Sequence, residues 1–310
     1  MTEEIDWSKK TDEELDEIEQ REELSTGLTT LDQFFTFKTG YYVICANPGA
    51  GKGWFATWLA KQFFIIHNKR SVFFSLEMAE PLVRTRVLQQ WSGLTEEQLV
   101  GGNTTLAKSL MKENAMLVYP FGQDDAGYQT PENFTKDIER FYEQGYRIFL
   151  FDHLHELDGS NDNTRNQKVI EQWGKAFQAL CKNYPEIWLF IFAQPNGAAA
   201  GKAVLTRTDV AGSKSITQKC EVFISLNRKL LATSKELQQS EINQQDRSIL
   251  LWIDKNRLSS QQRVGRFLHL SKTGNFTQDP NSDVMPDEIV KESPQLNLLE
   301  AKKDEKREVN

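Results

Sequence analysis

The sequence predicts an α/β fold with a mainly parallel central sheet flanked by helices. Short apolar runs alternate with segments of helical period along most of the 310 residues, which is typical of repeated strand–helix–strand units. The first of these runs, residues 41–46, leads into a glycine-rich loop that ends in Lys52, and a helical segment follows it. A chain of this length accommodates one large α/β domain, or one domain with extensions.

Composition excludes several classes of protein. No apolar run reaches the roughly 18–20 residues that a membrane-spanning helix needs, and the first residues do not form a signal peptide. Cys45, Cys181 and Cys220 are scattered without C-x-x-C spacing, so we expect buried thiols in a reducing compartment and neither disulfides nor a zinc site. These features predict a cytoplasmic protein with no membrane contact.

Negative charge is concentrated at the start of the chain. The net charge is −7, and residues 1–24 hold 11 acidic and 3 basic side chains, so the rest of the chain is nearly neutral. The overall sign therefore neither indicates nor excludes DNA as a partner, since basic residues lining one channel are enough to hold a phosphate backbone.

We expect three regions along the chain. Residues 1–24 form an acidic arm whose helix has few apolar anchors, so it is either a solvated, frayed segment or a linker helix that docks on a neighbouring subunit. Residues 25–279 contain the folded domain. Residues 280–310 are polar, charged and interrupted by proline, and are expected to form a flexible tail.

Apolar runs and helical patterns together predict the elements of the domain. Strands are expected at residues 41–46, 71–76, 116–119, 147–152, 187–193, 221–226 and 248–254, with a final hairpin at 264–277. Helices are expected at residues 52–67, 80–90, 95–100, 104–113, 131–144 and 165–183. The stretch 195–219 is basic and rich in small residues, and we expect it to be a long loop that is either functional or disordered.

The loop after the first strand follows the phosphate-binding pattern G-x-x-x-x-G-K-[ST] with two departures. In that pattern backbone N–H groups hold the phosphates, the lysine reaches the terminal ones and a hydroxyl binds Mg²⁺. Here Ala46 replaces the first glycine and Gly53 replaces the hydroxyl residue. The positive end of the following helix adds to the attraction for an anion. The predicted nucleotide-binding residues are Asn47, Pro48, Gly49, Ala50, Gly51, Lys52 and Gly53.

Carboxylates follow two of the other expected strands. Glu77 comes directly after the second strand, where it either orients a water for attack on the γ-phosphate or caps the next helix. Asp152 ends the apolar strand 147–152 and is the candidate Mg²⁺ ligand. His153 and His155 share one strand face beside it, but no further set of cysteines or histidines accompanies them. A dedicated transition-metal site is therefore not favoured.

Polar and basic residues follow the later strands. Gln194 is either a sensor of the γ-phosphate or an amide that caps a turn. Lys255 and Arg257 come after the strand 248–254 and are either surface charges or cations offered to the nucleotide of a neighbouring subunit. The loop 196–219 carries cations among glycines and alanines, which suits a phosphate backbone but is equally typical of a solvated loop.

The order of these motifs resembles the RecA-like motor domain of hexameric replicative DNA helicases, of the DnaB, phage primase-helicase and Twinkle type. The ordered motifs are the phosphate loop, Phe-Phe-Ser-Leu-Glu-Met, the strand ending in Asp-His, Gln-Pro-Asn, the basic loop and Lys-x-Arg. The stretches at residues 25–32, 209–216 and 264–274 match as well, and the resemblance covers about residues 25–279. It implies a RecA-like P-loop NTPase core that ends in a C-terminal hairpin.

The resemblance implies that three side chains act in catalysis at the nucleotide of the chain itself and that a fourth binds the metal. Lys52 binds the β- and γ-phosphates of ATP or another NTP, and Asp152 holds Mg²⁺. Glu77 polarises the attacking water, while Gln194 senses the γ-phosphate. The implied activity is nucleotide hydrolysis that drives movement along DNA and unwinding of the duplex during replication.

The resemblance also implies a homo-hexameric ring around single-stranded DNA. Arg257, with Lys255, is then the finger that enters the site of the adjacent subunit, and the acidic arm docks on the next subunit. The tail at residues 280–310 is a candidate contact for a primase or a polymerase. The residues expected to grip the DNA strand are Lys202, Arg207, Gly212, Ser213 and Lys214.

Several features depart from the family pattern. Gly53 removes one Mg²⁺ ligand, which water can replace because Mg²⁺ keeps several waters in any case. The basic loop reads Val-Ala-Gly-Ser-Lys, with Lys214 in place of the charge of a lost arginine. No primase, zinc-binding or DnaB-like N-terminal portion precedes the motor motifs, so we expect a minimal, phage-encoded version that acts in the host cytoplasm and does not prime by itself.

Two other functions stay open. A hydrolysis-poor RecA-like accessory or loader subunit is favoured by Gly53, but the presence of Glu77, Asp152 and Arg257 argues for turnover. A recombinase of the RecA/RadA kind is less consistent with the final hairpin, whose Lys-Thr-Gly resembles that of the helicases. A motor is distinguished from an accessory subunit by nucleotide hydrolysis that increases in the presence of single-stranded DNA. It is distinguished from a recombinase by the formation of closed rings instead of filaments.

Overall fold

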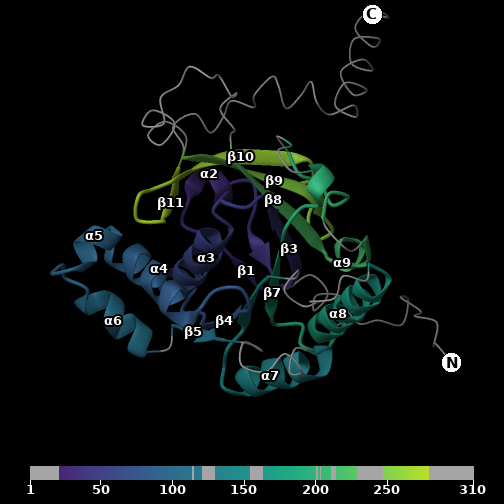
Figure 1. Ribbon diagram of the computed structural model, residues 1–310, viewed down its shortest axis with the longest axis horizontal. Helices are drawn as coiled ribbons and strands as arrows, with labels where there is room; N and C mark the ends of the chain where they lie inside the picture. Colours follow the sequence, from purple (N-terminus) through teal and green to yellow (C-terminus); the bar gives the residue numbers. More distant parts are fainter. Residues whose placement is uncertain are drawn as a thin grey trace, which may run out of the picture.

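A nine-stranded sheet in the order β11–β10–β9–β8–β3–β7–β6–β4–β5 forms the centre of the protein (Figure 1). The computed structural model describes residues 21–113, 115–120, 130–153, 163–199, 202, 204–210, 214–228 and 247–278. The strands of this sheet are β3 (Gly40–Ala46), β4 (Ser71–Ser75), β5 (Met116–Tyr119), β6 (Ile148–Asp152), β7 (Trp188–Ala193), β8 (Val222–Arg228), β9 (Ser248–Asn256), β10 (Val264–Leu270) and β11 (Phe276–Gln278).

Six neighbouring strands, from β8 to β5, run parallel, and β9, β10 and β11 extend the sheet in antiparallel fashion. Parallel strands are covered on both faces, which explains why every residue of β3, β4, β6 and β7 is buried. The carboxyl ends of these strands meet at one edge of the sheet, where ligands of open α/β folds bind. The predicted α/β fold, with a mainly parallel sheet and a C-terminal hairpin, is confirmed.

Helices cover both faces of the sheet (Figure 1). Side chains alternate along β3, so that Tyr42 and Ile44 pack in one apolar cluster while Tyr41 and Val43 pack in the other. The first cluster includes side chains from α3 (Lys52–His67), α4 (Glu80–Ser92) and α6 (Thr105–Lys112), and the short α5 (Glu96–Leu99) lies against α4. The second includes side chains from α7 (Pro131–Glu143), α8 (Asn163–Asn183) and α9 (Lys214–Lys219).

A short segment of two strands and one helix precedes the sheet, in a region where the sequence predicted no element. It contains β1 (Glu23–Leu24), α2 (Thr29–Asp32) and β2 (Phe37–Lys38). The Asp32 carboxylate accepts hydrogen bonds from the backbone N–H groups of Thr26 and Gly27, both at 2.7 Å, and from the Thr26 hydroxyl at 2.8 Å. Gly27 has φ +79°, a conformation that favours glycine. Elements of two to four residues are too short for a periodic pattern, which is why they were missed.

The stretch 195–219 differs from the predicted long loop. Pro195 pairs with Val210 in an isolated bridge, Gly197–Ala199 form the 3₁₀ helix η4, and the last six residues form α9. The buried Asp209 carboxylate holds the segment together, because it accepts hydrogen bonds from the Thr206 backbone N–H (2.8 Å) and hydroxyl (2.9 Å). The prediction of a loop was therefore wrong for the end of this stretch, which is helical and packs on α8.

Parts of the sequence prediction fall outside the described residues. The structure does not describe most of the acidic arm (residues 1–20) or the tail from residue 279 onward. His155, Gly212 and Ser213 also lie outside the described residues. Among the helices that the structure describes, none is both long and apolar enough to cross a membrane. The three cysteines are free, as predicted, with Cys45 and Cys220 buried.

Candidate functional site

The phosphate loop lies between β3 and α3, as predicted. Gly49 and Gly51 have φ +76° and +92°, a conformation that glycine adopts without strain. Helix α3 begins at Lys52, and its first hydrogen bond runs from the Phe55 N–H to the Gly51 carbonyl. No side chain in the described part of the protein caps this helix. The N–H groups of residues 51–54 are therefore available to an anionic ligand.

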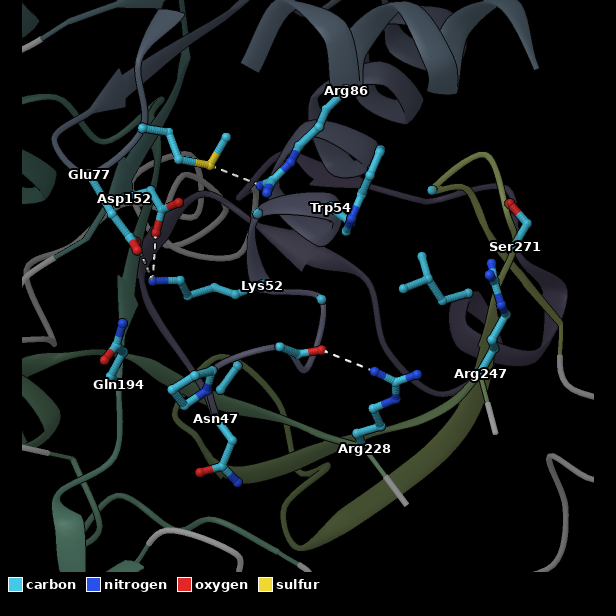
Figure 2. A pocket seen from close by; sticks show the side chains of 18 of the residues that line it. Asn47, Lys52, Trp54, Glu77, Arg86, Asp152, Gln194, Arg228, Arg247 and Ser271 are labelled. Carbon is cyan, nitrogen blue, oxygen red and sulfur yellow. Dashed lines mark hydrogen bonds and ion pairs between the residues drawn. The ribbon is translucent and has the colours of Figure 1, made fainter. Parts of the chain in front are cut away.

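A cavity of about 620 Å³ opens beside this loop (Figure 2). Its wall includes the phosphate loop, the loops after β4 and β7, the ends of β6 and β8, and the turn between β10 and β11. The cations of the wall are Lys52, Arg86, Arg228, Arg247 and Lys272, and the carboxylates are Glu77 and Asp152. An excess of cations over carboxylates favours a polyphosphate ligand.

Lys52 and two carboxylates form the centre of the cavity. Lys52 Nζ lies 2.8 Å from Asp152 Oδ1 and 4.0 Å from Glu77 Oε2. The Asp152 side chain is 3% exposed, whereas that of Glu77 is 47% exposed and lies at the rim. A buried carboxylate next to a phosphate loop is a ligand that Mg²⁺ accepts, so these residues fit a Mg²⁺–nucleotide complex. Gln194 lines the same cavity from the end of β7 (Figure 2). The structure thus brings together four side chains that the sequence predicted as one site.

His153 is a partner of Glu77 that sequence reasoning did not identify. Its Nδ1 lies 3.1 Å from Glu77 Oε2, and the histidine side chain is 2% exposed. One ligand atom from each of Glu77, Asp152 and His153 lies within 4.8 Å of the others. The sequence placed the histidine directly after the β6 aspartate, but only the pairing of β4 with β6 brings it to Glu77.

Arg86 reaches the cavity from α4 without any local motif to indicate it. Its guanidinium carbon lies 5.3 Å from the centroid of the Trp54 ring, and its Nη1 donates a hydrogen bond to the Met78 sulfur at 2.9 Å. Burial lowers the pKa of Arg86, while the carboxylates of Asp152 and Glu77 act in the opposite direction. The side chain is directed towards the phosphate loop, above Lys52 in the view of Figure 2.

Two more arginines on the far wall were also missed. Arg228 is the last residue of β8, and Arg247 directly precedes β9. Arg228 Nη1 donates to the Gly49 carbonyl at 3.4 Å, so it touches the phosphate loop itself (Figure 2). The rule that ligands bind at the carboxyl ends of parallel strands would have indicated Arg228, since β8 is one of those strands.

Comparisons with known proteins agree with this geometry. Residues 23–278 match the family described as DnaB-like helicase C terminal domain. The chain belongs to this family. The chain is also 24% identical over 214 residues to the replicative DNA helicase DnaB of Leifsonia xyli subsp. xyli (strain CTCB07), a match that covers 66% of the chain and 46% of that protein. It thus spans less than half the length of this relative.

Solved structures of similar fold include another DnaB-like protein. The ATPase domain of G40P has a TM-score of 0.62 at 15% identity, covering 78% of this chain and 85% of that one. A DnaB-like replicative helicase, described with its interactions with primase, has a TM-score of 0.64 at 17% identity, and the match covers 78% of this chain and 57% of that one. A KaiC-like protein from Pyrococcus horikoshii OT3 has a TM-score of 0.58 at 14% identity, and the match covers 84% of this chain and all of that one. These likenesses show the RecA-like fold.

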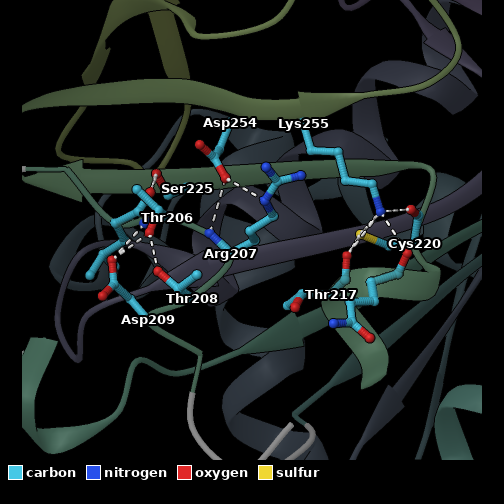
Figure 3. A network of polar contacts seen from close by, with 11 residues as sticks. Thr206, Arg207, Thr208, Asp209, Thr217, Cys220, Ser225, Asp254 and Lys255 are labelled. Carbon is cyan, nitrogen blue, oxygen red and sulfur yellow. Dashed lines mark hydrogen bonds and ion pairs between the residues drawn. The ribbon is translucent and has the colours of Figure 1, made fainter. Parts of the chain in front are cut away.

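In this DnaB-like chain Lys255 is directed inward, contrary to the expectation that it faces a neighbouring subunit. The residue is 5% exposed, and its ammonium donates hydrogen bonds to the backbone carbonyls of Thr217 (2.9 Å), Gln218 (2.8 Å) and Cys220 (2.5 Å), as Figure 3 shows. Burial lowers the pKa of Lys255. Lys255 therefore caps the end of α9, whose last carbonyls have no helical partner.

Arg257 lies at the end of β9 and is exposed. Because β9 is antiparallel to β8, with Asn256 opposite Val222, Arg257 lies at the amino edge of the parallel strands. The phosphate loop is at the opposite edge, and the seven residues of β3 that separate the two edges span roughly 20 Å. Arg257 therefore cannot reach the nucleotide cavity of its own chain.

The predicted DNA-binding cations are partly neutralised within the chain. Lys202 Nζ lies 2.6 Å from Asp209 Oδ1. Arg207 Nε lies 3.7 Å from Asp254 Oδ2, as Figure 3 shows. Lys214 begins α9. The structure therefore does not bring Lys202 and Arg207 into one free basic patch, and their role on DNA stays a prediction.

Proposed function

We propose that this chain is a nucleotide-hydrolysing motor that moves along single-stranded DNA and separates duplex strands during replication. The observation that carries the proposal is the convergence of Lys52, Glu77, Asp152 and Gln194 on one cation-lined cavity in a chain of the DnaB-like helicase family. ATP or another NTP with Mg²⁺ is the expected ligand. The alternatives of an accessory subunit and a recombinase lack a comparable observation.

Each side chain has a separate task in the proposed reaction. The free N–H groups at the start of α3 hold the phosphates, and Lys52 exchanges its contact with Asp152 for the β- and γ-phosphates. Mg²⁺, when held by Asp152, supplies positive charge to the phosphate oxygens. Glu77 accepts a proton from the attacking water, and His153 keeps its carboxylate in position. Gln194 contacts the γ-phosphate from the end of β7.

The proposed assembly is a homo-hexameric ring. The exposed Arg257, which is too far from its own cavity, then stabilises the transition state in the neighbouring subunit. Lys202, Arg207, Gly212, Ser213 and Lys214 are proposed to face the DNA strand in the channel. A primase or a polymerase is a further proposed partner, through residues 280–310, and the host cytoplasm is the proposed location.

Hydrolysis measured with and without single-stranded DNA tests the proposal. We expect DNA-stimulated ATP turnover in the unmodified chain, a loss of nucleotide binding in Lys52→Ala, and binding without turnover in Glu77→Gln. Turnover no higher than that of Lys52→Ala would contradict the motor and leave the accessory subunit. Electron microscopy with nucleotide distinguishes closed rings from the filaments of a recombinase.

The contribution in trans is tested by mixing variants. Arg257→Ala is expected to bind nucleotide normally but to hydrolyse it slowly, because its own cavity is intact. Mixed with Glu77→Gln subunits, it is expected to regain turnover, since an Arg257→Ala cavity then meets an intact Arg257 from its neighbour. Absence of any regain in mixed assemblies would refute a role in the neighbouring site.

A further inference from the structure

The exposed Arg257 lies in the turn that joins β9 to β10, and the residue before it is buried. Asn256 is 1% exposed. Its Oδ1 accepts hydrogen bonds from the backbone N–H groups of Leu258 (2.9 Å) and Ser259 (3.2 Å), and its Nδ2 donates to the Ser259 hydroxyl at 2.7 Å. An asparagine side chain that bonds to the backbone two residues later forms an Asx turn. The Asn256 amide therefore closes the chain around Arg257.

The peptide group that links Asn256 to Arg257 is held at both of its polar atoms. The Arg257 N–H donates to the carbonyl of Glu221, directly before β8, at 2.9 Å. The Asn256 carbonyl accepts a hydrogen bond from Gln262 Nε2 at 2.6 Å. Together with the Asx turn, these contacts fix the backbone on either side of the Arg257 Cα atom. A cation on a backbone that is already fixed needs little reordering when it meets a ligand.

A cavity of about 380 Å³ borders this turn, so apolar packing alone does not determine its conformation. Residues 256 and 258–261 line one side of the cavity, and residues 32–36 and 38 line the other. Leu258 packs against the first apolar cluster but is only partly buried, and Ser259, Ser260 and Gln261 are exposed. A well-packed interior would hold a turn by itself, whereas space beside it leaves that task to hydrogen bonds. Asn256 is the buried residue that supplies them.

We propose that Asn256 is a positioning residue, which holds the backbone of Arg257 in the conformation from which its guanidinium reaches the nucleotide of the neighbouring subunit. The inference rests on the proposed function, since it requires a ring in which Arg257 acts in trans. Asn256 cannot contact the nucleotide of its own chain, because it lies with Arg257 at the amino edge of the parallel strands. Misplacement of a catalytic group by about 1 Å can cost roughly 100-fold in rate. Loss of the Asn256 amide therefore slows turnover without weakening nucleotide binding.

ATP hydrolysis in the presence of single-stranded DNA tests this with two variants of similar size. Asn256→Asp keeps an oxygen that accepts from both backbone N–H groups, whereas Asn256→Leu has none. We expect kcat to fall roughly tenfold to 100-fold in Asn256→Leu with KM unchanged, and to stay within about threefold of the unmodified chain in Asn256→Asp. Full activity of Asn256→Leu would overturn the proposal, as would an Asn256→Asp variant no faster than Asn256→Leu.

A second pair of variants changes the turn without touching Asn256. Ser259→Ala removes the hydroxyl that accepts from Asn256 Nδ2 and, at 3.3 Å, from the Gln261 N–H. Ser260 is also exposed, and its hydroxyl has no hydrogen bond within the described part of the chain, so Ser260→Ala is the control. We expect a lower kcat in Ser259→Ala only. Equal kcat values in these two variants would contradict the proposal.

Mixed assemblies separate positioning in trans from damage to the subunit itself. An Asn256→Leu subunit next to a Glu77→Gln subunit has an intact cavity that meets an intact Arg257, so we expect turnover to be regained. A subunit whose own fold is damaged would not regain it, and that result would overturn the proposal. The double variant Asn256→Leu/Arg257→Ala is expected to be no slower than Arg257→Ala, and a further loss would also overturn it.

The same measurements distinguish failure of this inference from failure of the proposed function. If Arg257→Ala hydrolyses ATP slowly while Asn256→Leu is unaffected, the role of Asn256 is refuted and the motor with its finger stands. If Arg257→Ala hydrolyses ATP like the unmodified chain, the proposed action of Arg257 in trans is refuted, and the role of Asn256 with it.

Discussion

Replacement of Lys255 by methionine is expected to lower the free energy of unfolding by about 3 kcal/mol. The buried ammonium donates to three backbone carbonyls at the end of α9, at 2.5–2.9 Å. Hydrogen bonds from a charged donor contribute roughly 1.5–3 kcal/mol each, or about 6 kcal/mol for three. Methionine has a similar length, and it also removes the cost of burying the ammonium, which is a few kcal/mol. About half of the contribution of the three hydrogen bonds is therefore lost in net terms.

Thermal and urea unfolding of Lys255→Met measure this loss. For a domain of this size about 3 kcal/mol corresponds to a fall in Tm of about 6–10 °C. Lys175→Met is the control, because Lys175 is 65% exposed and pairs with Glu171 on the surface of α8, where solvent screens the interaction. A Lys255→Met protein as stable as the control variant would refute the capping role. Loss of hydrolysis at unchanged stability would instead return Lys255 to the role of a finger beside Arg257.

Three further outcomes follow from packing and titration. Gly274→Ala is expected to lower the free energy of unfolding by about 2 kcal/mol more than Gly93→Ala, as measured by thermal unfolding. Both glycines have φ above +70°, but only a Cβ atom at position 274 would meet an indole ring. Equal losses in the two variants would contradict this. Burial tends to raise the pKa of Asp209, but hydrogen bonds from neighbouring side chains outweigh it and hold the pKa below its usual value. The stability that the Asp209 carboxylate confers is present above about pH 4 and is lost as pH falls through the lowered pKa. Below about pH 4 the free energy of unfolding is therefore expected to depend less steeply on pH in Asp209→Asn than in the unmodified chain. An equal slope in the two proteins would refute this. Burial raises the pKa of Cys45 and Cys220 to about 12, so iodoacetamide at pH 8 is expected to modify both in urea and neither in the native protein, as mass spectrometry of peptides would reveal.

The sequence by itself determined the sheet and the centre of the candidate site. The apolar runs of the parallel strands are continuous because these strands are buried on both faces, so their positions can be read locally. Lys52, Glu77, Asp152 and Gln194 lie at the end of such a strand or within a few residues after it. Parallel strands end at one edge, so four local positions in the chain sufficed to predict one shared cavity.

Only the tertiary structure decided which cations belong to that cavity and which do not. Arg86 enters it because α4 packs against α3, and the helical pattern of α4 does not indicate which of its arginines faces the phosphate loop. Lys255 is buried instead of exposed because its ammonium binds the carbonyl of Cys220, which lies 35 residues earlier and directly after α9. A local pattern reports the period of burial along one element, whereas the destination of a long charged side chain depends on elements that are distant in the sequence.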